Sequence, residues 1–98
     1  MSVFAADVDG DGDKDLAVAN TLGGNVSVLK NNGDGTFAIA VNYAVGIQPV
    51  SVIAADFDGN GNQDLAVANM SSNNISVLIN LGDGTFASAV NYEVGSGP

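Results

Sequence analysis

Two short segments of the chain carry aspartates at alternating positions, with glycines between them. The first runs Asp7-Val8-Asp9-Gly10-Asp11-Gly12-Asp13-Lys14-Asp15. Carboxylates stand at loop positions 1, 3, 5 and 9, and position 7 can offer a backbone carbonyl. These are hard oxygen ligands of the kind that Ca²⁺ takes in flexible coordination by about six to eight oxygens, whereas Mg²⁺ requires a tighter octahedron. The segment therefore predicts a calcium loop.

A solvated turn without metal is the alternative interpretation, because Asp and Gly are ordinary turn residues. Carboxylates this close together raise one another's pKa and strain a loop unless a cation neutralises them, which favours the metal. The spacing is that of an EF-hand up to position 9, but position 12 is Val18 instead of a bidentate Glu. The flanking segments are not helical either.

These loops belong to a repeat. Residues 50–98 repeat residues 1–49, with 32 of the 49 aligned positions identical. A fixed period of this length indicates a repeat architecture, in which one unit cannot bury its own apolar face and stacks on its neighbours. We therefore predict two units, residues 1–49 and residues 50–98.

Each unit is predicted to hold four strands and no helix. In the first unit these strands are residues 2–6, 16–19, 25–30 and 38–45, and the first two are apolar on both faces, as in strands buried between layers. Four-stranded antiparallel sheets repeated at this spacing are typical of β-propeller blades. The predicted fold class is all-β, with two blades per chain. An eight-stranded sandwich closed within one chain is the alternative.

A second motif in each unit is Asn-x-Gly-Asp-Gly-Thr-Phe, at residues 31–37 and 80–86. We predict a hairpin turn there instead of a phosphate-binding loop, because neither a Lys nor a helix follows. The phenylalanines that end this motif, and Tyr43 and Tyr92 after it, are expected to pack, although an exposed Tyr could also stack on a sugar.

Together the two motifs resemble the FG-GAP/VCBS-type repeat, which is also similar to the calcium-binding blades of integrin α-subunit propellers. The resemblance covers essentially the whole chain, twice, and implies a propeller blade whose first loop holds Ca²⁺. It implies two ions per chain. The implied ligands are Asp7, Asp9, Asp11, Asp13 and Asp15 in the first loop and Asp56, Asp58, Asn60, Asn62 and Asp64 in the second, with Asp13 and Asn62 binding through their backbone carbonyls.

The two predicted sites differ in charge. Asn60 stands where the first loop has Asp11, so the second loop has one side-chain carboxylate fewer. An amide oxygen can bind calcium but brings no charge, and affinity in such loops depends on ligand charge. We predict that the first site binds calcium more tightly.

The amino-acid composition excludes several classes of partner and of catalytic site. The chain has 11 acidic and 2 basic residues, a formal charge of −9, which would repel nucleic acid and anionic membrane surfaces. It has no His and no Cys, which excludes imidazole and thiolate catalysis, disulfides and an ordinary zinc site. We expect no enzyme. The apolar runs are too short to span a bilayer, and the first residues show no signal peptide.

Two blades cannot close a ring, because propellers have about four to eight. A head-to-tail contact between copies closes a ring when its rotation divides a full turn. We therefore expect a homotrimer with six blades or a homotetramer with eight. The alternative is that the chain is an excised or designed segment of a longer propeller.

These features are compatible with three functions. The first is a calcium-stabilised propeller module with a structural role. The second is a carbohydrate-binding lectin, for which the absence of Trp is unfavourable. The third is an adhesion module that binds a protein through loops on one propeller face. Because weak calcium loops fill at the millimolar levels found outside cells, the family resemblance implies an extracellular or cell-surface origin.

Overall fold

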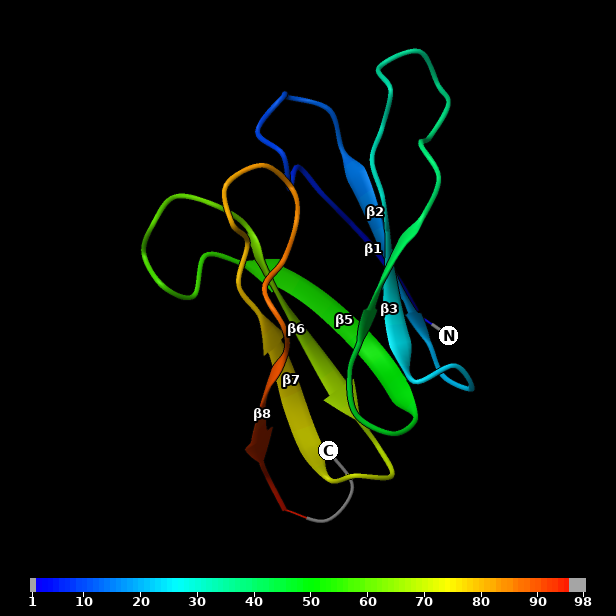
Figure 1. Ribbon diagram of the computed structural model, residues 1–98, viewed down its shortest axis with the longest axis vertical. Coiled ribbons are helices and arrows are strands. Elements are labelled where there is room, and N and C mark those ends of the chain that lie inside the picture. Colours follow the sequence, from blue (N-terminus) through cyan, green and yellow to red (C-terminus); the bar gives the residue numbers. More distant parts are fainter. Residues whose placement is uncertain (1, 96–98) are drawn as a thin grey trace.

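The computed structural model describes residues 2–95, which form two four-stranded antiparallel sheets (Figure 1). The strands of the first sheet are β1 (Ser2–Ala6), β2 (Asp15–Asn20), β3 (Asn25–Leu29) and β4 (Val41–Ala44). Those of the second are β5 (Pro49–Ala55), β6 (Asp64–Asn69), β7 (Asn74–Leu78) and β8 (Val90–Glu93). Each sheet follows chain order. The predicted all-β class with two four-stranded sheets is confirmed, while the predicted outer bounds, Met1 and Pro98, lie outside the described residues.

The last strand of the first sheet is shorter than predicted. It begins at Val41, which pairs with Val28, and not at Ala38. Residues 31–37 form a turn closed by a bridge between Asn31 and Phe37, and this turn extends beyond the end of β3. The chain must first return along β3, so ladder pairing starts only at Val41. Among residues 2–95 there is also no helix that could cross a membrane.

The two faces of each sheet carry different side chains, because successive residues of a strand point to opposite sides. We name them after the second strand of each sheet. The strand registers place Phe4, Ala17, Ala19, Val26, Val28 and Tyr43 on the alanine face of the first sheet, and Ile53, Ala66, Ala68, Ile75, Val77 and Tyr92 on that of the second. The leucine face holds Val3, Leu16, Val18 and Leu29 in the first sheet and Val52, Leu65, Val67 and Leu78 in the second.

The core lies between the alanine face of the first sheet and the leucine face of the second. Buried residues of these two faces form one apolar cluster with Val8 and Phe86. Along it, β5 lies against β1 and β2 (Figure 1). At the last strand of the first sheet, the ring of Tyr43 on β4 stands edge-on to that of Phe86, with ring centroids 5.4 Å apart. Equivalent sheets thus meet through opposite faces.

The outward faces remain apolar. Val3 on the leucine face of the first sheet is 61% exposed, and Tyr92 on the alanine face of the second is 58% exposed. The prediction that residues 2–6 are buried on both sides is therefore wrong for β1, because neither sheet formed by residues 2–95 covers its leucine face. A closed sandwich would alternate apolar inward with polar outward residues. The apolar outward faces disfavour that alternative.

Candidate metal centres

The loop between β1 and β2 brings four carboxylates together. Oxygen atoms of Asp7, Asp9, Asp11 and Asp15 all lie within 4.8 Å of one another. Calcium–oxygen distances are about 2.3–2.6 Å, so ligands of one ion lie at most about 5 Å apart. Gly10 and Gly12 have φ values of 78° and 90°, a conformation that lets the chain turn around the side chains. The four oxygens are therefore spaced as ligands of a single cation.

Backbone donors hold the first carboxylate of the loop. The N–H groups of Gly10 and Gly12 each donate to Asp7 at 2.9 Å, one to each oxygen, and that of Asp11 donates at 3.2 Å. These bonds, the one from Gly12 foremost, lower the pKa of the Asp7 carboxyl. Asp7 is thus fixed in the loop as an anion.

Asp9 experiences the opposite effect. Burial raises the pKa of the Asp9 carboxyl, and the nearby Asp11 and Asp15 raise it further. The loop therefore holds one carboxyl whose ionised form is favoured and one whose ionised form is disfavoured. A cation beside them would remove that conflict.

Asp15, the first residue of β2, joins the loop to the sheet. It is 1% exposed, and its two oxygens accept the N–H groups of Val8 at 2.9 Å and Asn31 at 2.8 Å. The two oxygens of its copy, Asp64, likewise accept the N–H groups of Phe57 and Asn80. Each of these buried carboxylates is thus fixed by two backbone donors, while its remaining lone pairs are available to the loop.

The second loop repeats this arrangement with one carboxylate fewer. Oxygen atoms of Asp56, Asp58 and Asp64 lie within 4.8 Å of one another. Asn60 Oδ1 accepts the N–H of Asn62 at 3.0 Å, as Asp11 Oδ1 accepts that of Asp13 at 2.9 Å. The Asn60 side chain therefore takes the position of Asp11, and its oxygen replaces a carboxylate oxygen without the charge.

All the predicted side-chain ligands lie in these two loops. The side chain of Asp13 stands outside the first carboxylate group. For Asp13 and Asn62 the sequence predicts ligation through the backbone carbonyl, and that role stays a prediction.

Two asparagines that the sequence did not predict as site residues also contact the loops, Asn31 the first loop and Asn80 both. Asn31 Nδ2 donates to the Lys14 carbonyl at 3.0 Å, and Asn80 Nδ2 donates to the Gln63 carbonyl at 3.0 Å. Asn80 also donates to the carbonyl of Val8, in the other unit, at 2.6 Å. Both asparagines begin the Asn-x-Gly-Asp-Gly-Thr-Phe motif, so their signal was present, but the motif predicted only a turn.

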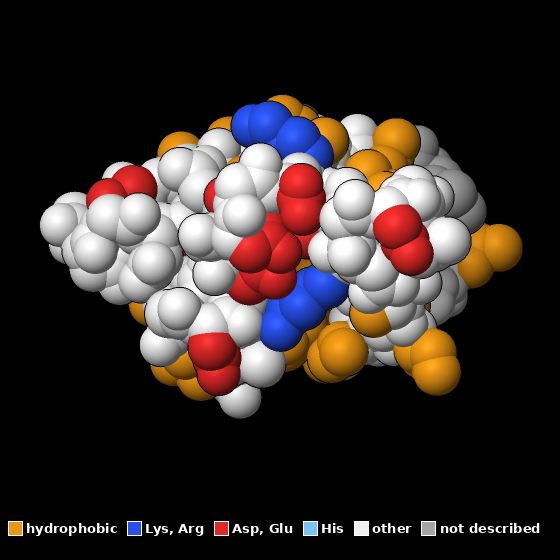
Figure 2. All heavy atoms as spheres, turned by 90° about the horizontal axis from the view of Figure 1, so that it is seen from above, with side chains coloured by type: hydrophobic (Ala, Val, Ile, Leu, Met, Phe, Trp, Pro, Cys, Tyr) orange, Lys and Arg blue, Asp and Glu red, His pale blue; other side chains and the backbone are white. Residues whose placement is uncertain are grey.

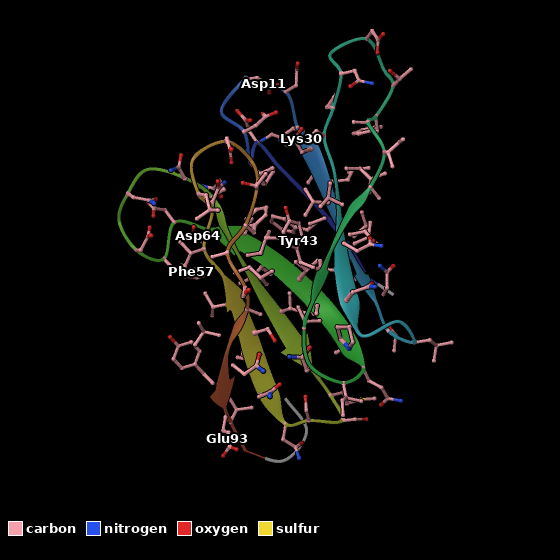
Figure 3. All side chains as sticks on the ribbon, viewed as in Figure 1. Asp11, Lys30, Tyr43, Phe57, Asp64 and Glu93 are labelled. Atoms are coloured by element: carbon pink, nitrogen blue, oxygen red, sulfur yellow. The ribbon has the colours of Figure 1, made fainter. Side chains whose placement is uncertain are left out.

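The turn of the second sheet therefore covers the first loop. Lys30 lies between the two, and its Nζ donates to the Asp83 carbonyl at 2.9 Å (Figure 3). Asp7 and Asp9 are accordingly half-buried, whereas Asp56 and Asp58 are exposed. Viewed onto this end, the acidic side chains gather in the middle with lysine side chains beside them (Figure 2). The first loop is thus part of the contact between the sheets.

The comparison with protein families agrees with these features. The family profile of the FG-GAP-like repeat matches residues 7–67 and, again, residues 56–98. No curated protein and no solved structure gives a significant match. The two matches together span nearly all of the chain and include both aspartate loops. The chain belongs to the FG-GAP-like repeat family.

Proposed function

We propose that the chain is a calcium-binding module of two β-propeller blades, with a structural and interaction role and no catalytic one. The observation that carries this proposal is the convergence of four carboxylates within 4.8 Å in the first loop, repeated with three in the second. Like charges at this distance repel unless a cation lies among them. One ion in each loop would change the formal charge of the chain from −9 to −5.

Calcium suits these loops better than magnesium. The loops bend at glycines and offer carboxylate, amide and backbone oxygens, a set that fits the irregular, high coordination number of Ca²⁺. Mg²⁺ needs near-ideal octahedral geometry and gives up its water reluctantly. Titration of the metal-free protein with each ion by calorimetry tests this choice. Saturation by Mg²⁺ at the lower concentration would contradict it.

Two matched variants separate the sites. Asp7→Ala and Asp56→Ala remove the same ligand from the first and the second loop. We expect Asp7→Ala to abolish the tighter of two binding steps and Asp56→Ala the weaker one, because the first loop has more charge. Glu93→Ala is the control, since Glu93 is exposed at the end of the molecule remote from the loops (Figure 3). Prior filling of the second site would overturn the order.

Calcium bound only by the folded loops must stabilise the fold. We expect a chelator in excess to lower the melting temperature, and an unchanged melting temperature would count strongly against the metal.

We further propose that copies of the chain complete the ring. We also propose that the module works outside cells, where calcium is abundant enough to fill loops of modest affinity.

A further inference from the structure

We infer that the two outward faces of the chain bind each other between copies. The alanine face of the second sheet of one copy packs on the leucine face of the first sheet of the next copy. This inference rests on the proposed assembly and specifies the surfaces that make it.

The contact between the two sheets of one chain is the model for the proposed contact between copies. The copies of its buried residues, 49 positions away, are all half-buried or exposed, although the two sheets have the same registers. Val52 is 2% exposed and its copy Val3 is 61% exposed. Val8 is 4% exposed, whereas its copy Phe57 is 48% exposed and lies on the side of the second sheet away from the first (Figure 3). Both halves of a second contact are therefore present and uncovered.

Aromatic side chains match at this second contact. Within the chain, Tyr43 packs edge-on against Phe86, and its hydroxyl accepts the Phe86 N–H at 3.3 Å. The copies of these residues, Tyr92 and Phe37, are 58% and 39% exposed. Tyr92 of one copy would pack on Phe37 of the next in the same way. Beside Tyr92 the alanine face has a shallow hollow of about 140 Å³, lined by small and branched residues that include Ala66, Ala68 and Ile75.

The same contact would reach the second calcium loop. Asn80 donates to the Val8 carbonyl, between two predicted ligands of the first loop. The corresponding pair is Asn31 of one copy and the Phe57 carbonyl of the other. A neighbouring copy would thus cover the second loop as the second sheet covers the first. Calcium affinity at that loop should rise on assembly.

One difference makes the junction between copies weaker. Lys30 donates to the Asp83 carbonyl within the chain, but its copy is Ile79. The junction between copies therefore lacks one charge-assisted hydrogen bond. Dilution should separate the copies while the contact within each chain persists.

Because the two surfaces are different, the assembly is head-to-tail and every junction needs one of each. Val3→Arg blocks the leucine face of the first sheet, and Tyr92→Arg blocks the alanine face of the second. Both side chains are exposed, so each variant should fold. Sedimentation velocity in excess calcium should show an oligomer for the unmodified chain and a monomer for either variant. An equimolar mixture of the variants should form a discrete dimer, because exactly one pair of intact surfaces is left.

Glu93→Arg is the matched control. Glu93 follows Tyr92 on the same strand and therefore points to the opposite face, and both Glu93 and its copy Ala44 are exposed. This variant should assemble like the unmodified chain. An unmodified chain that stays monomeric, variants that still assemble, or folded variants that do not dimerise on mixing would each overturn the inference.

Calcium titration of the monomeric Tyr92→Arg variant separates this inference from the proposed metal sites. Two binding steps, with only the weaker one further weakened relative to the assembled chain, support both. Equal affinities in monomer and oligomer would refute the covering of the second loop. No calcium binding in a chain that assembles would refute the metal sites and leave the interface standing.

Discussion

Val3 and Val52 are the same residue at the same register position of two nearly identical sheets, yet one is 61% exposed and the other 2%. The difference lies in what stands beside each sheet. The alanine face of the first sheet packs on the leucine face of the second, whereas no sheet in the described part of the chain packs on the leucine face of the first. Burial in this repeat is therefore a property of the junction between units and not of the unit.

The two aspartate loops differ for the same reason. The first loop is covered by the Asn80–Phe86 turn and held by Asn80 and Lys30, whereas the second is exposed. The loops also differ in their own ligands, through Asp11 and Asn60. Position and sequence both favour the first site, so variants must separate the two contributions.

The largest difference between the sheets should appear in the core. Leu65 is fully buried and its copy Leu16 is only half-buried. Leu65→Ala should lower the free energy of unfolding by about 3 kcal/mol, within the usual range for buried leucines, and Leu16→Ala by about 1 kcal/mol. Urea denaturation in the Tyr92→Arg background measures both without assembly. Equal losses would mean that the two sheets are not distinguished by burial.

Exchange of one residue pair between the loops should reverse the calcium sites. In the double variant Asp11→Asn, Asn60→Asp, the second loop gains a carboxylate and the first loses one. If ligand charge dominates, the affinities should change by about tenfold each and the second site should fill first. If covering by the neighbouring turn dominates, the first site should stay tighter. Calorimetric titration combined with Asp7→Ala or Asp56→Ala identifies which site is filled.

A smaller effect should come from one hydroxyl. Tyr43→Phe leaves the Phe86 N–H without its acceptor and should cost about 1 kcal/mol of unfolding free energy. Tyr92→Phe should cost nothing in a monomer, because Tyr92 lies in the open, but should weaken assembly. Denaturation of each Phe variant in the monomeric Val3→Arg background measures the effect on unfolding free energy. Dilution of Tyr92→Phe in the otherwise unmodified chain measures the effect on assembly. A loss of stability from Tyr92→Phe in the monomer would contradict the expected difference between the two tyrosines.

The smallest effect concerns Asp9 in the chelated protein. The folded state raises the pKa of this carboxyl, so its ionised form weakens the fold above that pKa, and the penalty disappears as the pH falls towards the ordinary value of Asp. Asp9→Asn should therefore stabilise the metal-free chain at neutral pH, by less than about 1 kcal/mol because water screens the charges. The gain should vanish in acid. In saturating calcium the sign should reverse, because a ligand is lost, and melting curves with and without calcium check both.

The local structure was readable from the sequence. Alternation and turn residues predicted four strands per unit, and the alternating aspartates predicted which side chains converge. The start of the fourth strand was missed, because the Asn31–Phe37 turn extends beyond β3 by an amount that residue types do not encode. The contact from Asn80 to Val8 was also missed, because it depends on how one unit sits on the other. Equal sequences such as those around Val3 and Val52 cannot reveal which copy is covered.

The meeting of opposite faces also has an arithmetical consequence. If junctions between copies repeat the contact within the chain, the packing of an alanine face on a leucine face sets the same rotation at every junction. The number of blades in a closed ring would then stay constant when the number of units per chain changes. A chain extended to three units would close a six-bladed ring as a pair, but could not close an eight-bladed one, because three does not divide eight. The number of subunits in the oligomer of such a chain would therefore reveal how many blades the original ring has.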